Sequence, residues 1–293
     1  MSQRSKVFLV LGFGLLAASQ SGNLVRVGGA TPPVAIAAWR LAIASLLLAP
    51  LAGRRLAALA HLSGRQWAVL VAAAVALAAH LITWIAAVQH TTVANAAIFF
   101  SVNPVMTAIG GAWLYGERLT PRFGLAVVLG LAGVAWLGWG DWAGGSDALL
   151  GDGLALLCSV FFTLYFLAGK SLRPVLDNRA YVTALYGVAA LASFVALAAW
   201  GLPFADYGAR SWACFGLMAL VPTMLGHTGL NYALRYLDAG RVSLATLAEP
   251  LMAGLVAWPA WGEPLTLRSL AGYAIVCGAV ALVVTEPAGS AAR

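Results

Sequence analysis

Long apolar runs alternate along the chain with short segments that carry charged residues or turn formers. A run of about 20 apolar residues can cross the hydrocarbon core of a bilayer as an α-helix. The pattern predicts ten such helices, near residues 7–25, 34–51, 67–88, 93–114, 123–139, 152–172, 181–200, 212–233, 242–261 and 268–284. The breaks between them carry charges or turn formers, such as Arg54 and Arg55, Pro32 and Pro33, and Pro174.

Composition strengthens this interpretation, because 62% of the 293 residues are hydrophobic and only 9% are charged. Soluble domains carry about 25% charged residues. Ten spans of about 20 residues leave only about 90 residues for all connections and tails. The sequence therefore predicts an all-α polytopic membrane protein, surrounded by a lipid bilayer and without a separate soluble domain.

The basic residues predict the orientation of the spans. With the N-terminus in the cytoplasm, 13 of the 17 Lys and Arg residues fall on the cytoplasmic side. Arg26, Arg210 and Arg268 fall outside, and Arg40 lies in or near the second helix. This asymmetry predicts a multi-pass protein of a bacterial-type inner (plasma) membrane, with both termini cytoplasmic. It also accounts for the net charge of +7, so nucleic acid is not an expected partner. The first apolar run resembles a signal peptide but continues to Val27, and is predicted to be a retained span.

Two stretches 146 residues apart share one pattern. The first contains Asn103-Pro104, Gly116-Glu117, Leu119-Thr120 and Arg122, and the second repeats the spacing as Glu249-Pro250, Gly262-Glu263, Leu265-Thr266 and Arg268. The unit is five helices, an odd number, so its two copies must lie upside down relative to each other. We therefore predict two inverted repeats, residues 1–145 and 146–293. Such repeats are typical of secondary transporters, with the binding site near the midplane between them.

Ten helices in two halves with paired Pro…Gly-Glu motifs resemble the EamA branch of the drug/metabolite transporter superfamily, over essentially the whole chain. Within that branch, the length and the third helix with His80 and Trp84 are most similar to YddG-type exporters of aromatic and neutral amino acids. The resemblance implies helices around a central cavity, lined by helices one, three, four, six, eight and nine. It also implies export. Family substrates range over amino acids, nucleosides, other metabolites and drugs, so the fold alone does not select one.

Glu249 is the most costly residue to place in a membrane. It is the eighth residue of its predicted helix, about 10 Å deep at about 1.5 Å per residue. An ionised carboxylate there costs about 2.5 kcal/mol or more. It is predicted to be a substrate-amine or proton site, or else a structural carboxyl bonded to a neighbour such as Arg40. Asn103 occupies the equivalent place in the first half.

Pro104 and Pro250 follow these two polar residues. Each lacks an N–H group and so frees a carbonyl four residues earlier, at Phe100 and Thr246. In hydrocarbon a free carbonyl must find a polar partner. The matched positions predict a bend or hinge in both helices, and the alternative is a role in packing alone.

Polar residues form stripes on several helices, as Thr223, His227 and Asn231 do at a spacing of four. The predicted cavity residues are Glu249, Asn103, His80, Trp84, His227, Asn231, Thr223, Gln20, Asn23, Phe99 and Thr163. Amide and imidazole dipoles with aromatic walls would suit a zwitterion with an apolar side chain. The alternative for each stripe is hydrogen bonding between helices.

Enzyme signatures are absent from the sequence: it has no HExxH, no GxSxG and no metal-ligand spacing, and its three cysteines lie far apart. We expect no metal, no cofactor and no enzymatic activity. The predicted function is a carrier that exports small amino acid-like metabolites by alternating access. A proton-coupled exporter of drugs or other metabolites is the alternative, and a channel-like pore is a more distant one. The oligomeric state does not follow from the sequence.

Overall fold

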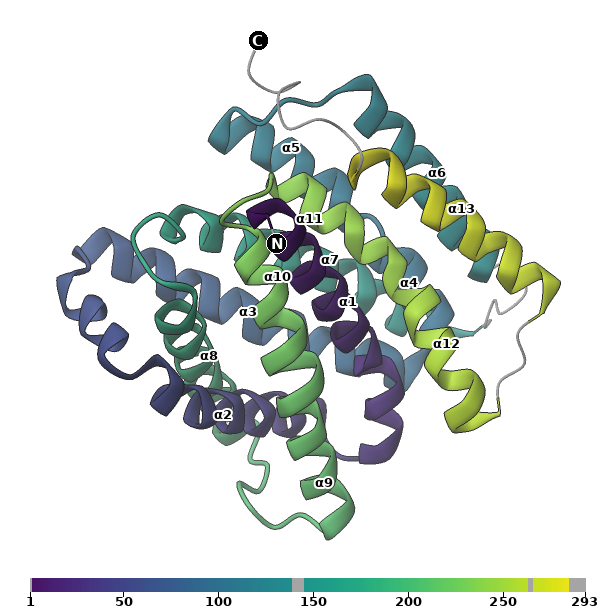
Figure 1. Cartoon of the computed structure of the whole chain (residues 1–293). Helices are drawn as coiled ribbons and strands as arrows, with labels where there is room; N and C mark the ends of the chain where they lie inside the picture. The colour runs from purple at the N-terminus through teal and green to yellow at the C-terminus, as the bar shows by residue number, and fades with distance from the viewer. Residues whose placement is uncertain (1, 139–144, 263–265, 285–293) are drawn as a thin grey trace.

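The structure is a computed structural model, in which residues 2–138, 145–262 and 266–284 are described. Within these residues every regular element is helical, which confirms the predicted class (Figure 1). The helices are α1 (Gln3–Gly28), α2 (Pro33–Ala52), η1 (Gly53–His61), α3 (Gly64–His90), α4 (Val93–Phe100), α5 (Asn103–Tyr115), α6 (Pro121–Gly138), α7 (Ser146–Leu172), α8 (Asn178–Ala199), α9 (Ala209–Met218), η2 (Ala219–His227), α10 (Thr228–Ala233), α11 (Ala239–Ala245), η3 (Thr246–Ala248), α12 (Glu249–Trp261) and α13 (Leu267–Val284).

Several of these helices combine into membrane-length segments. Eight helical segments of the described chain are long and apolar enough to cross a membrane, by length and composition. They are Gln3–Gly28, Pro33–His61, Gly64–His90, Asn95–Tyr115, Ser146–Leu172, Asn178–Ala199, Ala209–Ala233 and Ala239–Ala260. Two shorter apolar helices, Pro121–Leu137 and Leu267–Val283, correspond to the fifth and tenth predicted segments.

The glycines of the repeated Gly-Glu motif end helices in the same way. Gly116 follows α5 with φ 65°, and Gly262 follows α12 with φ 70°. Their N–H groups donate to carbonyls four residues back, at Ala112 and Trp258. A residue with a Cβ is strained in this left-handed conformation, so glycine is the usual helix terminator there. Helix termination therefore explains the glycine in both copies of the motif. Glu263 lies outside the described residues.

Three helices that the sequence predicts to be continuous are interrupted in the structure. The predicted helix 93–114 breaks between α4 and α5, just before Pro104, and the helix 242–261 contains the short 3-10 segment η3 just before Pro250. The helix 212–233 contains a π-helical segment, η2, around Pro222. There the Thr223 hydroxyl donates to the Met218 carbonyl at 2.8 Å. A proline removes a donor from the ladder, so the neighbouring backbone adopts another pattern.

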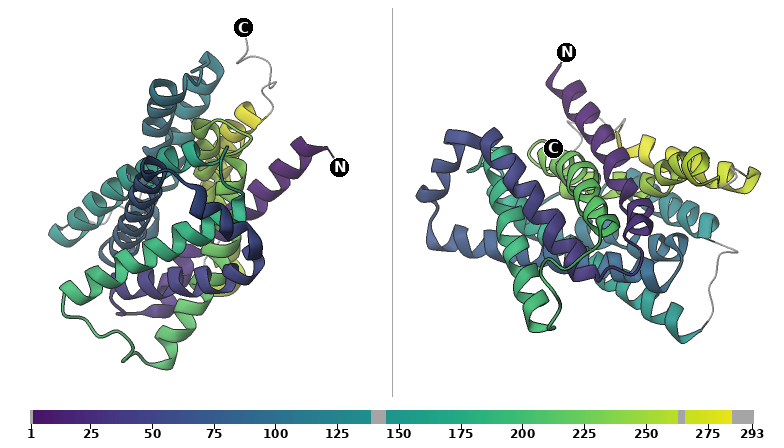
Figure 2. Two further views of the ribbon diagram at one scale, coloured as in Figure 1. Left: turned by 90° about the vertical axis from the view of Figure 1, so that its left-hand side faces the viewer. Right: turned by 90° about the horizontal axis from the view of Figure 1, so that it is seen from below.

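The main helix contacts join the N-terminal and C-terminal parts of the chain. The pairs are α3 with α7, α2 with α8, α6 with α13, α1 with η2 and α10, and α5 with α11. The α2–α8 and α6–α13 pairs lie on opposite sides of the molecule, with α1, α7, α10 and α11 between them (Figures 1 and 2). Residues distant in sequence therefore build the interior together.

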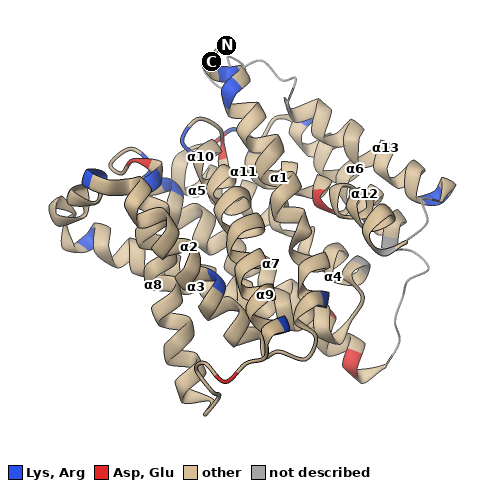
Figure 3. Cartoon of the chain, turned by 60° about the horizontal axis from the view of Figure 1, so that its bottom comes forward, with Lys and Arg blue, Asp and Glu red and all other residues tan. Residues whose placement is uncertain are grey.

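Apolar side chains also cover much of the surface. Phe13, Leu46 and Trp113 expose 72%, 72% and 84% of their surface. Charged residues are sparse, and most lie near helix ends or connections (Figure 3). A soluble protein rarely exposes apolar patches of this extent, whereas a bilayer requires them.

Candidate substrate cavity

A cavity of about 710 Å³ lies between α1, α3, α4, α6, α12 and α13. Its volume falls in the range of about 300–1,000 Å³ that small-molecule sites occupy. Ionisable and polar side chains contribute to its lining together with aromatic ones, including Ser19, Asn23, Arg26, Trp84, Phe100, Glu249, Arg268 and Tyr273. The cavity can therefore contact both a charged group and an apolar side chain of a ligand.

The cavity extends toward one end of the helices. Its lining includes Arg26 near the end of α1, Thr92 at the start of α4, and Thr266 and Arg268 at the start of α13. The predicted orientation places Arg26 and Arg268 on the outer side. By that orientation, the cavity occupies the outer half of the protein.

Glu249 is half-buried at the first position of α12 and lines the cavity. The carboxylate forms no ion pair with any Lys, Arg or His of the described residues. Arg40, the suggested partner, is wholly buried elsewhere, and its Nε donates to the Thr223 hydroxyl at 2.9 Å. Glu249 is thus an acidic group in the cavity wall without a basic partner in the described chain.

Two amides of α1 hold α12 in place. Asn23 lines the cavity, and its Nδ2 donates to the Ala253 carbonyl at 3.1 Å and to the Gln20 Oε1 at 3.0 Å. The Gln20 Nε2 lies 3.4 Å from the Met252 carbonyl. These bonds set the position of the α12 turn that follows Glu249. Gln20 itself lies beside the cavity rather than in its lining.

Aromatic rings separate the cavity from a pair of buried histidines. Trp84 and Phe100 line the cavity, with ring centroids 5.6 Å apart. His80 packs behind Phe100 at 5.7 Å and lies 5.8 Å from the His227 ring. His80 and His227 therefore lie together, but outside the cavity lining, and Phe100 stands between His80 and the cavity.

Asn103 ties the break between α4 and α5 to a neighbouring helix. Its Nδ2 donates to the Phe100 carbonyl at 2.8 Å, and its Oδ1 accepts a short hydrogen bond from the Ser243 hydroxyl. The Ser159 hydroxyl also donates to the Phe100 carbonyl at 2.8 Å. The carbonyl freed by Pro104 therefore has two donors, as the sequence predicts. At the second break, the Thr246 carbonyl accepts the N–H of Glu249.

We expect Asn103→Leu to lower the free energy of unfolding by about 1–3 kcal/mol, because it leaves Ser243 and the Phe100 carbonyl with fewer partners in the interior. Asn95→Leu is the matched control. Asn95 is equally buried on the same span, but its amide has no hydrogen-bond partner among the described residues. Thermal unfolding of both variants in detergent measures the difference. Equal losses of stability would contradict the structural role of Asn103.

The other predicted site residues lie outside the cavity lining. Thr163 Oγ1 is 3.2 Å from Thr107 Oγ1, which joins α7 to α5. The Phe99 carbonyl lies 3.2 Å from the Ser159 hydroxyl. Thr223 and Asn231 are buried in the network around Arg40 and His227, where the Asn231 Nδ2 donates to the His227 carbonyl at 2.8 Å. Of the predicted residues, the cavity brings together Glu249, Pro250, Asn23 and Trp84.

Sequence reasoning missed part of the lining. Arg26, Arg268 and Tyr273 line the cavity, as do Val134 and Leu137 of α6. Helices five and ten of the prediction thus contribute to the wall, whereas helices six and eight contribute no described residue. Arg26 and Arg268 are two of the three basic residues that the predicted orientation places outside, so they were exceptions to the positive-inside pattern, and that exception was the one signal the sequence offered.

Comparison with known proteins gives consistent matches. The model of the EamA-like transporter family matches twice, over residues 5–139 and 149–285. An uncharacterized transporter of Archaeoglobus fulgidus is 31% identical over 204 residues, covering 70% of this chain and 72% of the relative. A second one from the same organism is 25% identical over 198 residues, covering 65% and 67%. A protein of known crystal structure shares the fold, with a TM-score of 0.77 and 20% identity over 96% of each chain.

Proposed function

Because the chain belongs to the EamA-like transporter family, we propose that it is a secondary carrier that exports small metabolites by alternating access, with neutral and aromatic amino acids as the preferred substrates. The observation that carries this proposal is the cavity. Among the described residues, its lining combines one acidic side chain, Glu249, with the aromatic rings of Trp84 and Phe100. A carboxylate can bind a substrate ammonium, and aromatic rings can cover an apolar side chain.

Many carriers that work by alternating access are built from two related halves, and the helix contacts support such halves here. Under the proposed repeats, helices one to five correspond to helices six to ten. Three contacting pairs, α2–α8, α5–α11 and α6–α13, would then each join a helix to its equivalent in the other half. The contact α3–α7 joins predicted helices three and six, and α1–η2 joins helices one and eight, so each of these two contacts would be the equivalent of the other. This pattern of contacts is unchanged when the halves are exchanged. This symmetry supports two repeated units, residues 1–145 and 146–293. We further propose that the two units are inverted, because each has five spans, and that both termini lie in the cytoplasm of a bacterial-type inner membrane, as the distribution of Lys and Arg predicts.

The polar groups of the cavity favour a zwitterion. Glu249 supplies a negative charge, while Ser19, Asn23 and Ser101 supply neutral hydrogen-bonding groups. Arg26 and Arg268 make the predicted outer part of the cavity basic. A zwitterion with its ammonium toward Glu249 and its carboxylate toward the basic end would match this distribution of charge.

Counterflow in proteoliposomes tests the proposal. A panel of radiolabelled amino acids, nucleosides and cationic dyes is offered to vesicles loaded with the same compound or with buffer. We expect saturable uptake of neutral and aromatic amino acids, accelerated by internal substrate, because a carrier returns faster when loaded. Saturable transport of dyes alone would refute the amino acid proposal. Uptake without acceleration would indicate a pore.

A proton-coupled exporter is the second candidate, and the same residue favours it. Glu249 is an acidic group in the cavity without a basic partner in the described chain, so it could exchange a proton for a substrate cation. A pH gradient applied to the same vesicles separates the two mechanisms. An exporter without coupling equilibrates its substrate regardless of the gradient.

A further inference from the structure

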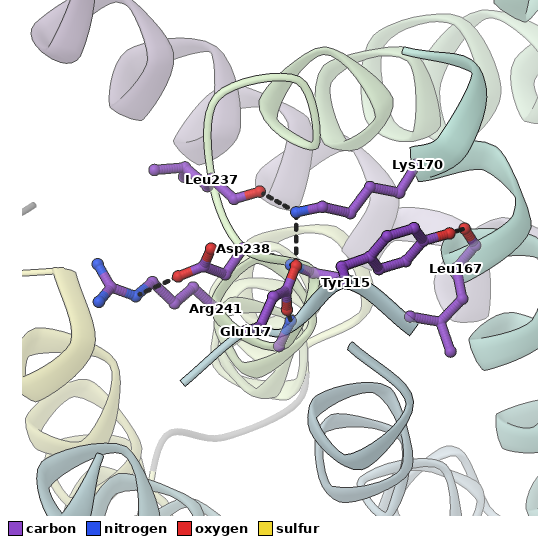
Figure 4. Close-up of polar contacts among 9 residues, drawn as sticks. Tyr115, Glu117, Leu167, Lys170, Leu237, Asp238 and Arg241 are labelled. Carbon is purple, nitrogen blue, oxygen red and sulfur yellow. Dashed lines mark hydrogen bonds and ion pairs between the residues drawn. The ribbon is translucent and has the colours of Figure 1, made fainter. Parts of the chain in front are cut away.

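A polar cluster centred on Glu117 lies at the end of the molecule away from the cavity, and none of its residues lines the cavity (Figure 4). The Lys170 Nζ lies 2.6 Å from the Glu117 Oε1 and donates to the Leu237 carbonyl at 2.9 Å. The backbone N–H of Ala239 donates to the same Oε1 at 3.0 Å, and that of Gly240 to Oε2 at 3.5 Å. One carboxylate thus binds both an ammonium and the first turn of α11.

Each contact of the Glu117 carboxylate crosses between the two parts of the chain. Glu117 lies in the connection between α5 and α6, whereas Lys170 is on α7 and Ala239 begins α11. A second link runs the same way, because the Tyr115 hydroxyl donates a short hydrogen bond to the Leu167 carbonyl. The cluster therefore fastens the proposed first repeat to two helices of the second.

Burial makes this ion pair different from a surface contact. The Glu117 and Lys170 side chains are only 8% and 18% exposed, whereas those of Arg55 and Asp177 are 52% and 46% exposed. Exposed pairs contribute little, but removing one partner of a buried pair leaves an uncompensated charge. The backbone makes room for the pair, because a side chain at Gly111 would collide with the Glu117 carboxylate. The Glu117 carboxylate thus packs directly against the backbone of α5 at Gly111.

Two spans each line the cavity toward one end and contribute to the Glu117 cluster at the other end. The span Asn95–Tyr115 contributes Ala97, Phe100 and Ser101 to the cavity and reaches the cluster at Tyr115. The span Ala239–Ala260 reaches the cluster at its first residue and lines the cavity from Thr246 onward. The first span is interrupted after Phe100, and the second at η3, where its cavity lining begins. The two ends of each span can therefore change their relative direction without bending a continuous helix.

We propose that Glu117 is a latch residue, which holds this end closed while the cavity is open toward the other end. Release of Lys170 and of the first turn of α11 is then the step that allows the closed end to open. By the predicted orientation, this end is cytoplasmic. The inference rests on the alternating access proposed above but does not depend on which substrate is carried.

Dipolar electron spin resonance in lipid nanodiscs tests the latch. Spin labels at Leu119→Cys and Val175→Cys, on a background without the native cysteines, report the separation of the two parts at the closed end, and both sites are exposed. In the parent protein we expect one dominant, short distance between the two spin labels, which corresponds to the closed state. Glu117→Gln and Lys170→Met should each raise the ratio of open to closed molecules by about tenfold, the effect of losing about 1.4 kcal/mol. The double variant should raise this ratio no further than the single variant with the larger effect does, because the two residues act through one ion pair.

Asp238→Asn is the matched control. Asp238 also lies at this end and pairs with Arg241 at 3.2 Å, but both partners belong to one part of the chain, in and beside α11. It should leave the distances unchanged. The latch is refuted if Glu117→Gln and Lys170→Met keep the parent distances, or if Asp238→Asn shifts them equally.

Glu117→Asp covers the case in which the neutral variants fail to fold. It keeps the charge but shortens the side chain, so that it reaches either Lys170 or α11. An intermediate shift is expected, and parent-like distances would again refute the latch. The measurement needs no substrate, so a failed counterflow assay bears on the proposed transport function and leaves this test independent.

Discussion

Replacing Glu249 by glutamine is expected to raise the KM for zwitterionic substrate by about tenfold or more, the effect of losing one charge-assisted hydrogen bond to the substrate ammonium. Glutamine has nearly the same shape, and the carboxylate has no basic partner within the described chain that would be left unpaired. Stability should therefore change little. Initial rates of counterflow against substrate concentration measure the KM.

Asp147→Asn is the control for this experiment. It also removes one carboxylate charge, but Asp147 is 74% exposed and pairs with His90, away from the cavity. Its KM should equal that of the parent. An unchanged KM in Glu249→Gln would remove Glu249 from substrate binding.

The same variant separates the two candidate mechanisms. If the carrier only equilibrates a zwitterion, Glu249→Gln retains transport at high substrate concentration. If Glu249 carries a proton, accumulation driven by a pH gradient disappears while exchange between two pools of substrate persists. Measuring accumulation and exchange on one preparation therefore distinguishes loss of affinity from loss of coupling.

Gly226→Val is expected to lower the free energy of unfolding by about 3 kcal/mol or more, and much of the protein should fail to reach the membrane. At Gly226, η2 packs directly against α1. A Cβ there would lie 2.7 Å from the backbone N of Ala18 and 2.8 Å from its Cα. Backbone atoms cannot move aside as a side chain can, so α1 and η2 would have to separate along their contact. Thermal unfolding in detergent and the yield of folded protein measure the effect.

Gly216→Val provides the comparison. Gly216 lies on the same span, in α9, and a Cβ there would meet no atom within 4 Å outside its own helix. Its intrinsic effect on helix formation is similar, so the difference between the two variants isolates the contact with α1. Equal stabilities would show that the close approach at Gly226 contributes nothing.

Much of the local structure follows from short-range chemistry. The ten apolar runs become helical segments, because a run of apolar residues in lipid must satisfy its backbone internally. Gly116 and Gly262 end their helices because glycine readily adopts a left-handed conformation. The breaks before Pro104 and Pro250 follow from a missing N–H group. Each of these effects acts within a few residues, so it can be predicted from sequence.

The polar stripes show where this reasoning ends. Thr223, His227 and Asn231 share a helix face, as their spacing predicts. That face meets Arg40, Tyr165 and Tyr186 instead of the cavity. A buried polar group can be satisfied by a protein partner as well as by water or substrate, and the spacing is the same in each case. The equivalent residues Glu249 and Asn103 likewise have different surroundings: Glu249 lines the cavity, whereas Asn103 accepts a hydrogen bond from Ser243.

By itself, the sequence determined the helical class, the positions of the spans, their interruption at two prolines and the repeated motif that resembles the EamA branch. These features depend on hydrophobicity and on backbone chemistry, which each residue carries with it. Only the tertiary structure decided that Glu249 lines a cavity and that Arg26 and Arg268 lie at one end of it. The same holds for the binding of Glu117 to Lys170 and α11, at the opposite end of the molecule. Those relationships depend on which faces of distant helices meet, and that outcome is set by the packing of the whole bundle.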